Sequence, residues 1–272
     1  MAVTHHPSGL GKLDRERLSA VMRGTKGTIT NDRAASIMGL DQADASKLLA
    51  RWCKKGWLSR VARGLYVPVP LEAERSDLPL DDPWLVVVSL YSPCYIGGWS
   101  AAEHWDLTEQ IFRTTVVMTT TRPRNRKPTF KGAPFWVSTI APEKMFGLKT
   151  VWRGSVKVAV SDPSRTILDM LSDPQFGGGI RSVQDMFRNY LGSDAKNLDQ
   201  LMEYAERLGN GAVFKRLGFL LEANAPQEIE AIERCQHHLT MGNARIDPKM
   251  PAEALLARWR LWVPHDWKSG VK

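Results

Sequence analysis

The stretch Thr28–Pro68, TITNDRAASIMGLDQADASKLLARWCKKGWLSRVARGLYVP, decides the fold of the N-terminal part of this chain. A helix is predicted over Thr30–Met38, with the Thr30 side chain as its N-cap. After a break at residues 39–41, a second helix is predicted over Gln42–Lys55, with Asp41 as its N-cap. Two helices joined by so short a turn indicate a helix-turn-helix.

The residues that follow the second helix predict a basic β-hairpin. Gly56 ends the helix, and the segments Trp57–Val61 and Leu65–Val67 indicate two strands around a tip at residues 62–64. Arg60 and Arg63 make this hairpin positively charged. A helix-turn-helix followed by a basic hairpin is typical of a winged helix, whose second helix enters the major groove of DNA. Double-stranded DNA is therefore the first partner to expect.

The second predicted helix has an apolar side and a basic side. Small and cationic residues lie on the basic side, where they can approach base edges and phosphates. Taken alone, the pattern favours an ordinary amphipathic helix with a solvated basic face. Joined to the first helix and the hairpin, it favours DNA binding. The residues predicted to pack inward are Ala45, Leu48, Leu49 and Trp52. The residues predicted to contact DNA are Ser46, Lys47, Ala50, Arg51, Lys54, Lys55, Arg60 and Arg63.

Length and composition predict a cytoplasmic protein of two domains. The 272 residues suffice for two hydrophobic cores, and the longest apolar run, Trp84–Val88, is too short to span a bilayer. No apolar signal core opens the sequence, and the isolated Cys53, Cys94 and Cys235 suit reduced thiols in a cytoplasm. We expect a winged helix-turn-helix domain over residues 12–70, an acidic, proline-spaced linker over 71–83 and a larger domain over 84–272.

The net charge of +8 is distributed unevenly along the chain. Residues 1–70 hold 12 Lys/Arg and 5 Asp/Glu, whereas residues 71–112 hold 1 and 8. Residues 113–157 hold 10 and 1, and so form a second basic block. Such a surface favours nucleic acid or another polyanion, although a solvated loop explains the second block equally well. The candidate surface residues of this block are Arg122, Arg124, Arg126, Lys127 and Lys131.

The larger domain is expected to be mixed α/β with a helical C-terminal part, which makes the whole chain α+β. Thr114–Thr121, Phe135–Val137 and Val156–Val160 are rich in β-branched and aromatic residues and predict strands. Trp84–Leu90 fits either a helix or a buried strand. From residue 182 onward the apolar spacing is mainly helical.

Three finer expectations concern local structure. A first helix is predicted over Leu13–Arg23, with Leu13, Leu18, Val21 and Met22 facing inward. Ser100 or a neighbour is expected to cap a helix that follows residues 95–98. The three consecutive glycines at residues 177–179 are expected to form a flexible break.

Two constellations of carboxylates could indicate a metal-dependent enzyme. Residues 192–194 (GSD) with Asp199 are similar to elements of nucleotidyltransferases. Such a site needs paired carboxylates on a strand to hold a divalent metal ion, whereas this segment is better explained as a loop that leads into a helix. Residues 247–249 (DPK) with Glu222 could be the remnant of a metal-dependent nuclease site, but Pro248 favours a simple turn.

Three further groups also have a simpler structural interpretation. Residues 235–238 (CQHH) bring their soft ligands too close together for a usual zinc site. Ser100 and His104 share a helical face but lack the setting of a nucleophile, so caps and core hydrogen bonds are expected. Asp162, Arg165 and Asp169 are predicted to form an internal salt-bridge network. We therefore predict no catalytic residue, no metal site and no cofactor.

Four segments, taken in order, resemble AbiEi-type antitoxins. They are Gly56–Tyr66 (GWLSRVARGLY), Tyr95–Trp105 (YIGGWSAAEHW), Ser161–Asp169 (SDPSRTILD) and Lys215–Glu222 (KRLGFLLE), and the resemblance covers about residues 12–265. That family comprises bacterial two-domain proteins encoded beside a nucleotidyltransferase-like toxin. The resemblance implies a winged-helix domain that binds repeats in its own promoter. It also implies a C-terminal domain that is needed for antitoxicity by a route that does not require stable toxin binding.

Taken together, these patterns predict a DNA-binding antitoxin that represses its own operon and counteracts a nucleotidyltransferase-like toxin. Its expected partners are operator repeats in double-stranded DNA and a cognate toxin, with no membrane partner. Three alternatives stay open. The chain could be an orphan winged-helix regulator without a toxin, a divergent metal-dependent nuclease, or an interaction module that engages a toxin through residues 84–272.

Overall fold

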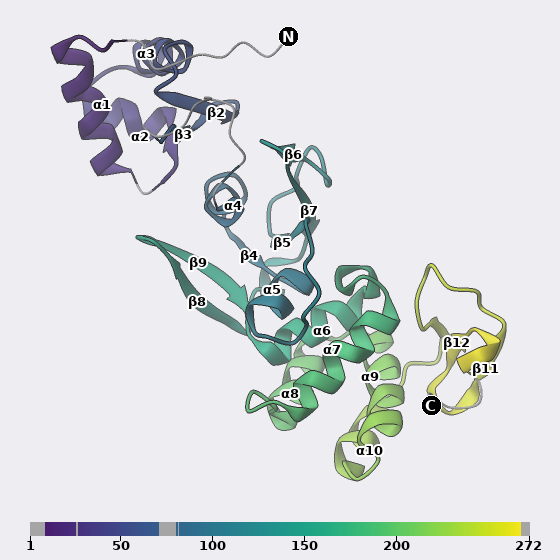
Figure 1. Ribbon diagram of the computed structural model, residues 1–272. Coiled ribbons are helices and arrows are strands. Elements are labelled where there is room, and N and C mark those ends of the chain that lie inside the picture. The colour runs from purple at the N-terminus through teal and green to yellow at the C-terminus, as the bar shows by residue number, and fades with distance from the viewer. Residues whose placement is uncertain (1–8, 26, 71–79, 81, 268–272) are drawn as a thin grey trace.

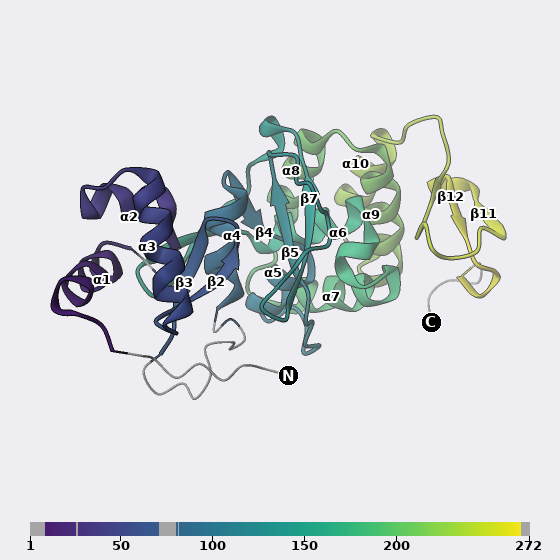
Figure 2. The same cartoon turned by 90° about the horizontal axis from the view of Figure 1, so that it is seen from above.

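The chain is a mixed α/β protein, and the computed structural model describes residues 9–25, 27–70, 80 and 82–267. Figure 2 shows its parts in order from one end to the other. A small N-terminal unit of three helices and three short strands comes first, followed by helix α4 (Pro83–Tyr91) and a six-stranded central sheet. A layer of helices then covers the far side of the sheet, and a small three-stranded sheet ends the molecule.

The N-terminal unit has its own hydrophobic core, built by Leu18, Val21, Leu49 and Trp52 among others. Its strands form an antiparallel sheet in the order β1-β3-β2. The predicted helices and hairpin are therefore present, with boundaries that differ by at most one residue. The elements are α1 (Lys12–Gly24), β1 (Ile29–Thr30), α2 (Asn31–Met38), α3 (Gln42–Lys54), β2 (Leu58–Ala62) and β3 (Leu65–Pro68).

The prediction that Leu13 and Met22 face inward is wrong. Their side chains are 58% and 45% exposed, whereas Leu18 and Val21 of the same helix are buried. At 3.6 residues per turn, Leu13 and Met22 lie on opposite sides of α1, so one narrow buried stripe cannot hold both.

The central sheet has six strands in the order β6-β7-β5-β4-β9-β8. β5 runs parallel to β7 and β4 runs parallel to β9, while the other neighbouring pairs are antiparallel. Successive residues of a strand point to opposite faces, so Val117 packs on the side of α4 and Val116 and Met118 pack against the other helices. The strands are β4 (Cys94–Ile96), β5 (Thr115–Thr119), β6 (Thr129–Phe130), β7 (Ala133–Thr139), β8 (Leu148–Arg153) and β9 (Val156–Ser161).

Helix α4 covers one face of the central sheet, where Trp84 and Val87 join the core. The alternative between helix and strand for this segment is therefore resolved as a helix. Pro83 occupies its first turn and the Asp82 side chain accepts a hydrogen bond from the Trp84 amide at 3.0 Å, and both features favour a helix start. The expected linker at residues 71–83 lies mostly outside the described residues.

Helix α6 (Pro163–Ser172) is the centre of the helical layer on the opposite face. Every residue from Pro163 to Leu171 is buried, because α5, α7, α8 and α9 all pack against this helix. Among the described residues, no helix is both long enough and apolar enough to cross a membrane. The other helices are α5 (Gly98–His104), α7 (Ile180–Gly192), α8 (Leu198–Leu208), α9 (Gly211–Asn224) and α10 (Ile229–His237), with 3-10 turns η1 (Pro142–Lys144) and η2 (Pro174–Gly177).

A small sheet in the order β10-β12-β11 completes the fold (Figure 1). It docks on α9 through Trp259, whose indole lies over Gly218 so closely that a Cβ atom there would be 2.0 Å from the ring. The elements are β10 (Ala244–Arg245), β11 (Ala254–Leu256), η3 (Ala257–Trp259), β12 (Leu261–Val263) and η4 (His265–Trp267).

Two local expectations in the larger part are also wrong. Helix α5 starts from Gly97 without a side-chain cap, and the Ser100 hydroxyl instead accepts a hydrogen bond from the Val116 amide at 3.0 Å. The glycines at residues 177–179 form a packed turn, since a Cβ atom on Gly177 would lie 2.3 Å from Val183. Gly177 therefore permits close packing, while Gly178 and Gly179 supply the positive φ angles, 81° and 106°, that the turn requires.

Candidate nucleic-acid interface

Helix α3 has one buried and one exposed side, as the sequence predicts. The Asp41 side chain caps the helix by accepting a hydrogen bond from the Asp44 amide at 2.7 Å. The predicted inward residues Ala45, Leu48, Leu49 and Trp52 are all buried. Lys47, Ala50, Arg51 and Lys54 are exposed on the remaining surface.

Helix α2 is capped at both ends and is joined to α3 at its start. The Thr30 side chain caps α2 through the Arg33 amide at 3.3 Å, and Gly39 ends it in a left-handed conformation with φ of 63°. At the start of α2, the Asn31 Nδ2 donates a hydrogen bond to the Ser46 Oγ at 2.8 Å. Ser46 is therefore half-buried and already accepts one hydrogen bond, while its hydroxyl proton stays available for donation.

The three predicted DNA-contacting cations Lys47, Arg51 and Lys55, on and directly after α3, have partners inside the protein. The Arg51 Nη2 lies 2.7 and 3.0 Å from the two carboxylate oxygens of Asp14 in α1, and the Asp14 side chain is only 14% exposed. The Lys47 Nζ lies 3.0 Å from Asp44, and both of these side chains are largely exposed. The Lys55 Nζ donates to the Gly9 carbonyl oxygen at 3.3 Å. Sequence spacing gives no signal for the Asp14–Arg51 pair, because its two residues belong to different helices.

Lys54 and Arg63 differ from these cations. Within the described part of the chain, neither side chain forms an ion pair or a hydrogen bond, and both are exposed. Arg60, on the neighbouring strand, uses its Nε to donate to the Ala62 carbonyl oxygen at 3.3 Å. Lys54 on α3 and Arg63 at the hairpin tip are thus the cations most readily available to an external anion.

The hairpin tip lies beside the start of α2 and beside α4. A cavity of about 400 Å³ opens there, and its lining includes Asn31, Arg63 and Ser89. The Thr28 and Ser89 hydroxyl oxygens lie 2.7 Å apart, which joins the N-terminal unit to α4. The hairpin tip is therefore held at the start of α2, where the Asn31 backbone amide donates to the Gly64 carbonyl oxygen at 3.2 Å, and it faces α4 of the larger part.

The second basic block occupies the connection between β5 and β6 and the β6–β7 turn. Arg122, Arg124, Arg126 and Lys127 are exposed there, and the Lys127 Nζ lies 4.6 Å from the centre of the Trp136 ring.

Part of this block lies near the N-terminal unit. Burial raises the pKa of the Cys53 thiol in α3 to about 11, and the charges of Arg60 and Lys131 both oppose this rise. Lys131, at the β6–β7 turn, is thus within electrostatic range of α3. The structure brings together basic residues that the sequence separates by an acidic segment.

The carboxylates considered for a metal-dependent nuclease have structural partners. Asp247 is buried and accepts hydrogen bonds from the Gln175 side chain and from the Ile180 and Lys249 amides, so that it holds the start of α7. Glu222 accepts from the Trp259 Nε1 at 2.5 Å and pairs with Arg258. In the part of the chain that the structure describes, no cluster of three or more His, Cys, Asp or Glu residues could hold a metal ion.

The other groups singled out in the sequence have ordinary structural surroundings. Cys235 is buried, which raises its thiol pKa to about 12, and its Sγ lies 3.8 Å from the Met202 sulfur. Gly192 is the last residue of α7, residues 193–194 follow it in the connection to α8, and Asp199 is exposed in the first turn of α8. The predicted internal salt-bridge network is confirmed for two of its three residues, since the Arg165 Nε lies 2.9 Å from Asp169 and both side chains are buried. Asp162 instead caps α6, because its side chain accepts a hydrogen bond from the Arg165 amide at 2.8 Å.

Comparison with known proteins identifies the N-terminal segment. Residues 16–69 match the family described as "Transcriptional regulator, AbiEi antitoxin". The matched segment runs from within α1 to the end of β3 and so contains α3 and the basic hairpin. The resemblance to AbiEi antitoxins is therefore confirmed for these residues.

A solved structure shows that similarity of fold extends along nearly the whole chain. The crystal structure of the RV2827C protein from Mycobacterium tuberculosis superposes with a TM-score of 0.56, covering 96% of this chain and 94% of that chain. The two sequences are 16% identical, so the likeness shows a shared fold. No curated protein matches the sequence.

Proposed function

We propose that this protein is a DNA-binding antitoxin that acts in the cytoplasm, represses its own operon and counteracts a nucleotidyltransferase-like toxin. One observation carries the proposal. The residues that match the AbiEi antitoxin family are those that fold into a capped helix-turn-helix with an exposed basic side and a basic hairpin. In this proposal residues 12–70 are a winged helix-turn-helix domain, and the chain from residue 84 onward is the antitoxin domain.

The exposed side of α3 would enter the major groove. Ala50 is small enough to let the helix approach base edges, and the Ser46 hydroxyl has one proton to donate to a base or a phosphate. Lys47 and Lys54 extend from the same side and would reach phosphates or guanine. The exposed pair between Lys47 and Asp44 is weak in water, so Lys47 can exchange its partner for a phosphate at little cost.

The hairpin and the neighbouring larger domain would contact the flanks of the same site. Arg60 and Arg63 would meet the sugar-phosphate backbone or the minor groove. Lys131 lies near the N-terminal unit, so we include Arg122, Arg124, Arg126, Lys127 and Lys131 as a second contact surface for the same DNA. Such contacts would add affinity without adding base specificity.

A footprinting experiment tests the regulatory half of the proposal. The full-length protein is incubated with the DNA upstream of its own gene and, as a control, with unrelated DNA of equal length and base composition. A discrete protected site on the upstream DNA, with a reporter driven by that DNA repressed in cells, is the expected result. Equal affinity for both fragments at physiological salt would refute specific operator recognition.

Co-expression tests the antitoxin half separately. The product of the gene adjacent to this one is induced with and without the full-length protein, and cell growth is followed. Rescue of growth supports the antitoxin assignment. The double variant Lys54→Ala, Arg63→Ala is expected to bind the operator poorly, and rescue of growth by this variant would place the antitoxin activity outside the DNA interface. A toxic neighbour that the protein does not counteract would leave a regulator without antitoxin activity.

A further inference from the structure

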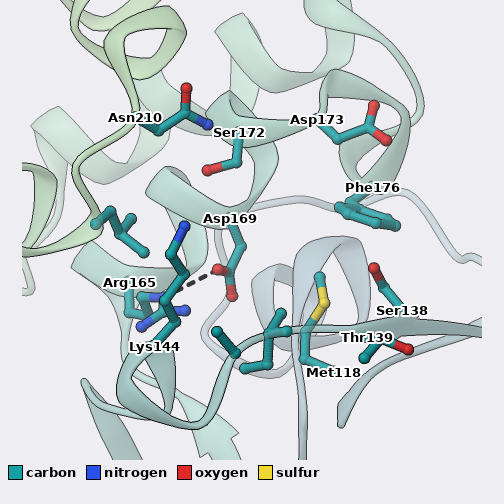
Figure 3. A pocket seen from close by; sticks show the side chains of 13 residues that line it. Met118, Ser138, Thr139, Lys144, Arg165, Asp169, Ser172, Asp173, Phe176 and Asn210 are labelled. Atoms are coloured by element: carbon teal, nitrogen blue, oxygen red, sulfur yellow. Dashed lines mark hydrogen bonds and ion pairs between the residues drawn. The ribbon is translucent and has the colours of Figure 1, made fainter. Parts of the chain in front are cut away.

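A polar cavity of about 340 Å³ lies in the larger part of the molecule, between the central sheet and the helical layer. Met118 of β5 and Ser138 and Thr139 of β7 form one wall, at the carboxyl ends of these two parallel strands (Figure 3). α6 forms the opposite wall. The crevice outside the carboxyl ends of parallel strands is where open α/β sheets generally bind their ligands.

A buried ion pair lines this cavity. The Arg165 guanidinium donates to Asp169 at 2.9 Å, to the Tyr95 hydroxyl at 2.8 Å and to the Phe146 carbonyl oxygen at 2.9 Å. The Tyr95 hydroxyl also donates to Asp169. Arg165 and Asp169 therefore neutralise each other, and their partners are supplied by the protein itself. They give the cavity a polar wall without offering a net charge to a ligand.

Three other lining groups keep unused hydrogen-bonding capacity within the described residues. Among these residues, the Lys144 Nζ has no hydrogen-bond partner. Asn210 caps α9 with its Oδ1, and its Nδ2 has no partner in this part of the chain. Asp173 uses its Oδ1 to accept from the Gln175 amide, while its Oδ2 makes no hydrogen bond. Figure 3 shows Lys144 on one side of the cavity and Asp173 on the other.

The charges of the lining select among classes of ligand. Lys144 and Arg165 balance Asp169 and Asp173, so the cavity has no net charge. A dianionic phosphate ester would meet the Asp173 carboxylate opposite Lys144, which disfavours it. A ligand with one carboxylate and one ammonium group would pair with Lys144 and Asp173 respectively, and both charge-assisted hydrogen bonds are strong ones.

The positions of Lys144 and Asp173 and the apolar walls set the size of that ligand. Figure 3 shows Lys144 and Asp173 on opposite sides of the cavity, so a ligand that pairs with both must carry its two charges at opposite ends. Phe176 and Leu208, both mostly buried, would cover its apolar body. The Asn210 amide would donate to a carbonyl oxygen between the two ends.

We propose that this cavity binds a zwitterionic ligand of dipeptide size, with its carboxylate on Lys144 and its ammonium group on Asp173. The site is distinct from the DNA interface, and the proposal does not depend on the proposed antitoxin function.

Calorimetric titration of the full-length protein tests this proposal. The probes are the dipeptides L-leucyl-L-leucine, L-alanyl-L-alanine and L-phenylalanyl-L-leucine, and N-acetyl-L-leucyl-L-leucinamide, which lacks both charges. Saturable binding of at least one dipeptide in the millimolar range or tighter, without binding of the blocked compound, is expected. Absence of binding by all three dipeptides, or equal binding of the blocked compound, overturns the proposal.

Charge-neutralising variants locate the bound ligand. Lys144→Gln and Asp173→Asn should each weaken dipeptide binding by about tenfold, the loss expected for one charged hydrogen bond. Asp173→Asn retains an acceptor for the Gln175 amide, so the turn stays capped. Lys249→Gln and Asp194→Asn remove exposed charges outside the cavity and serve as matched controls. Affinity unchanged in both cavity variants, or lowered equally in the controls, would overturn the assignment.

Discussion

Replacing Lys54 and Arg63 with alanine together gives the sharpest test of the proposed DNA interface. Both side chains are exposed, and neither has a partner in the part of the chain described here, so their loss should leave the fold unchanged. Each phosphate contact contributes a slope of about 0.9 to the dependence of log K on log salt concentration, so the double variant should lose about 1.8. When the salt concentration rises from about 50 to about 200 mM, the affinity of the parent protein relative to the double variant should therefore fall about tenfold.

Fluorescence anisotropy with labelled operator DNA, measured at several salt concentrations, supplies the slope. The affinity deficit of the double variant should be largest at low salt and should shrink as salt rises, because screening removes the contribution of the lost contacts. Lys249→Ala is the matched control, since it removes an exposed cation that lies outside the N-terminal unit. A slope identical to that of the parent protein, with an unchanged melting temperature, would show that these two cations do not touch DNA.

Three further predictions concern the stability and reactivity of the fold. Asp169→Ala should lower the free energy of unfolding by about 3–5 kcal/mol, because it leaves Arg165 buried without a counter-charge. Urea denaturation measures this free energy. A loss of stability no larger than that of the exposed-site control Asp194→Ala would contradict the prediction. Burial lowers the pKa of His104 from 6.5. As pH falls, His104 therefore binds a proton in the unfolded chain at a higher pH than in the folded protein. The stability of the fold should decline as pH falls below about 6.5. In His104→Gln, thermal melts between pH 7 and 5 should lose this part of the decline, and an unchanged pH profile would argue against it. Burial raises the thiol pKa to about 11 for Cys53 and Cys94 and to about 12 for Cys235. Alkylation of these thiols at pH 8, followed by mass spectrometry, should therefore be slow until denaturant is added. Rapid modification of the native protein would refute the burial argument.

Local structure in the N-terminal unit could be predicted because its signals are local. Thr30 and Asp41 cap the helices through amides three residues ahead, and Gly39 ends α2 in the backbone conformation that glycine adopts most easily. The inward stripe of α3 follows from helical periodicity alone. The inward placement of both Leu13 and Met22 was wrong, because the two residues lie on opposite sides of α1 and an apolar residue becomes buried only where another element covers it.

The larger part was harder to predict from sequence. Short strands such as Cys94–Ile96 lack a clear period, and this segment becomes a strand because β5 and β9 pair with its two edges. The α6 salt bridge was predictable from the i, i+4 spacing of Arg165 and Asp169. Tyr95 and Phe146, which complete its hydrogen bonds, come from distant parts of the chain.

The sequence by itself determined which residues of the N-terminal unit are helical, which side of α3 is apolar and which residues carry positive charge. Those properties depend on caps, periodicity and residue type, which act over a few neighbouring residues. Only the tertiary structure decided how available each charge is. It placed Arg51 in an ion pair with Asp14 and brought Lys131 near α3. It left Lys54 and Arg63 without a partner in the described chain. The physical reason is that ion pairing and electrostatic range depend on distances in space, which residues far apart in sequence acquire only when the elements pack.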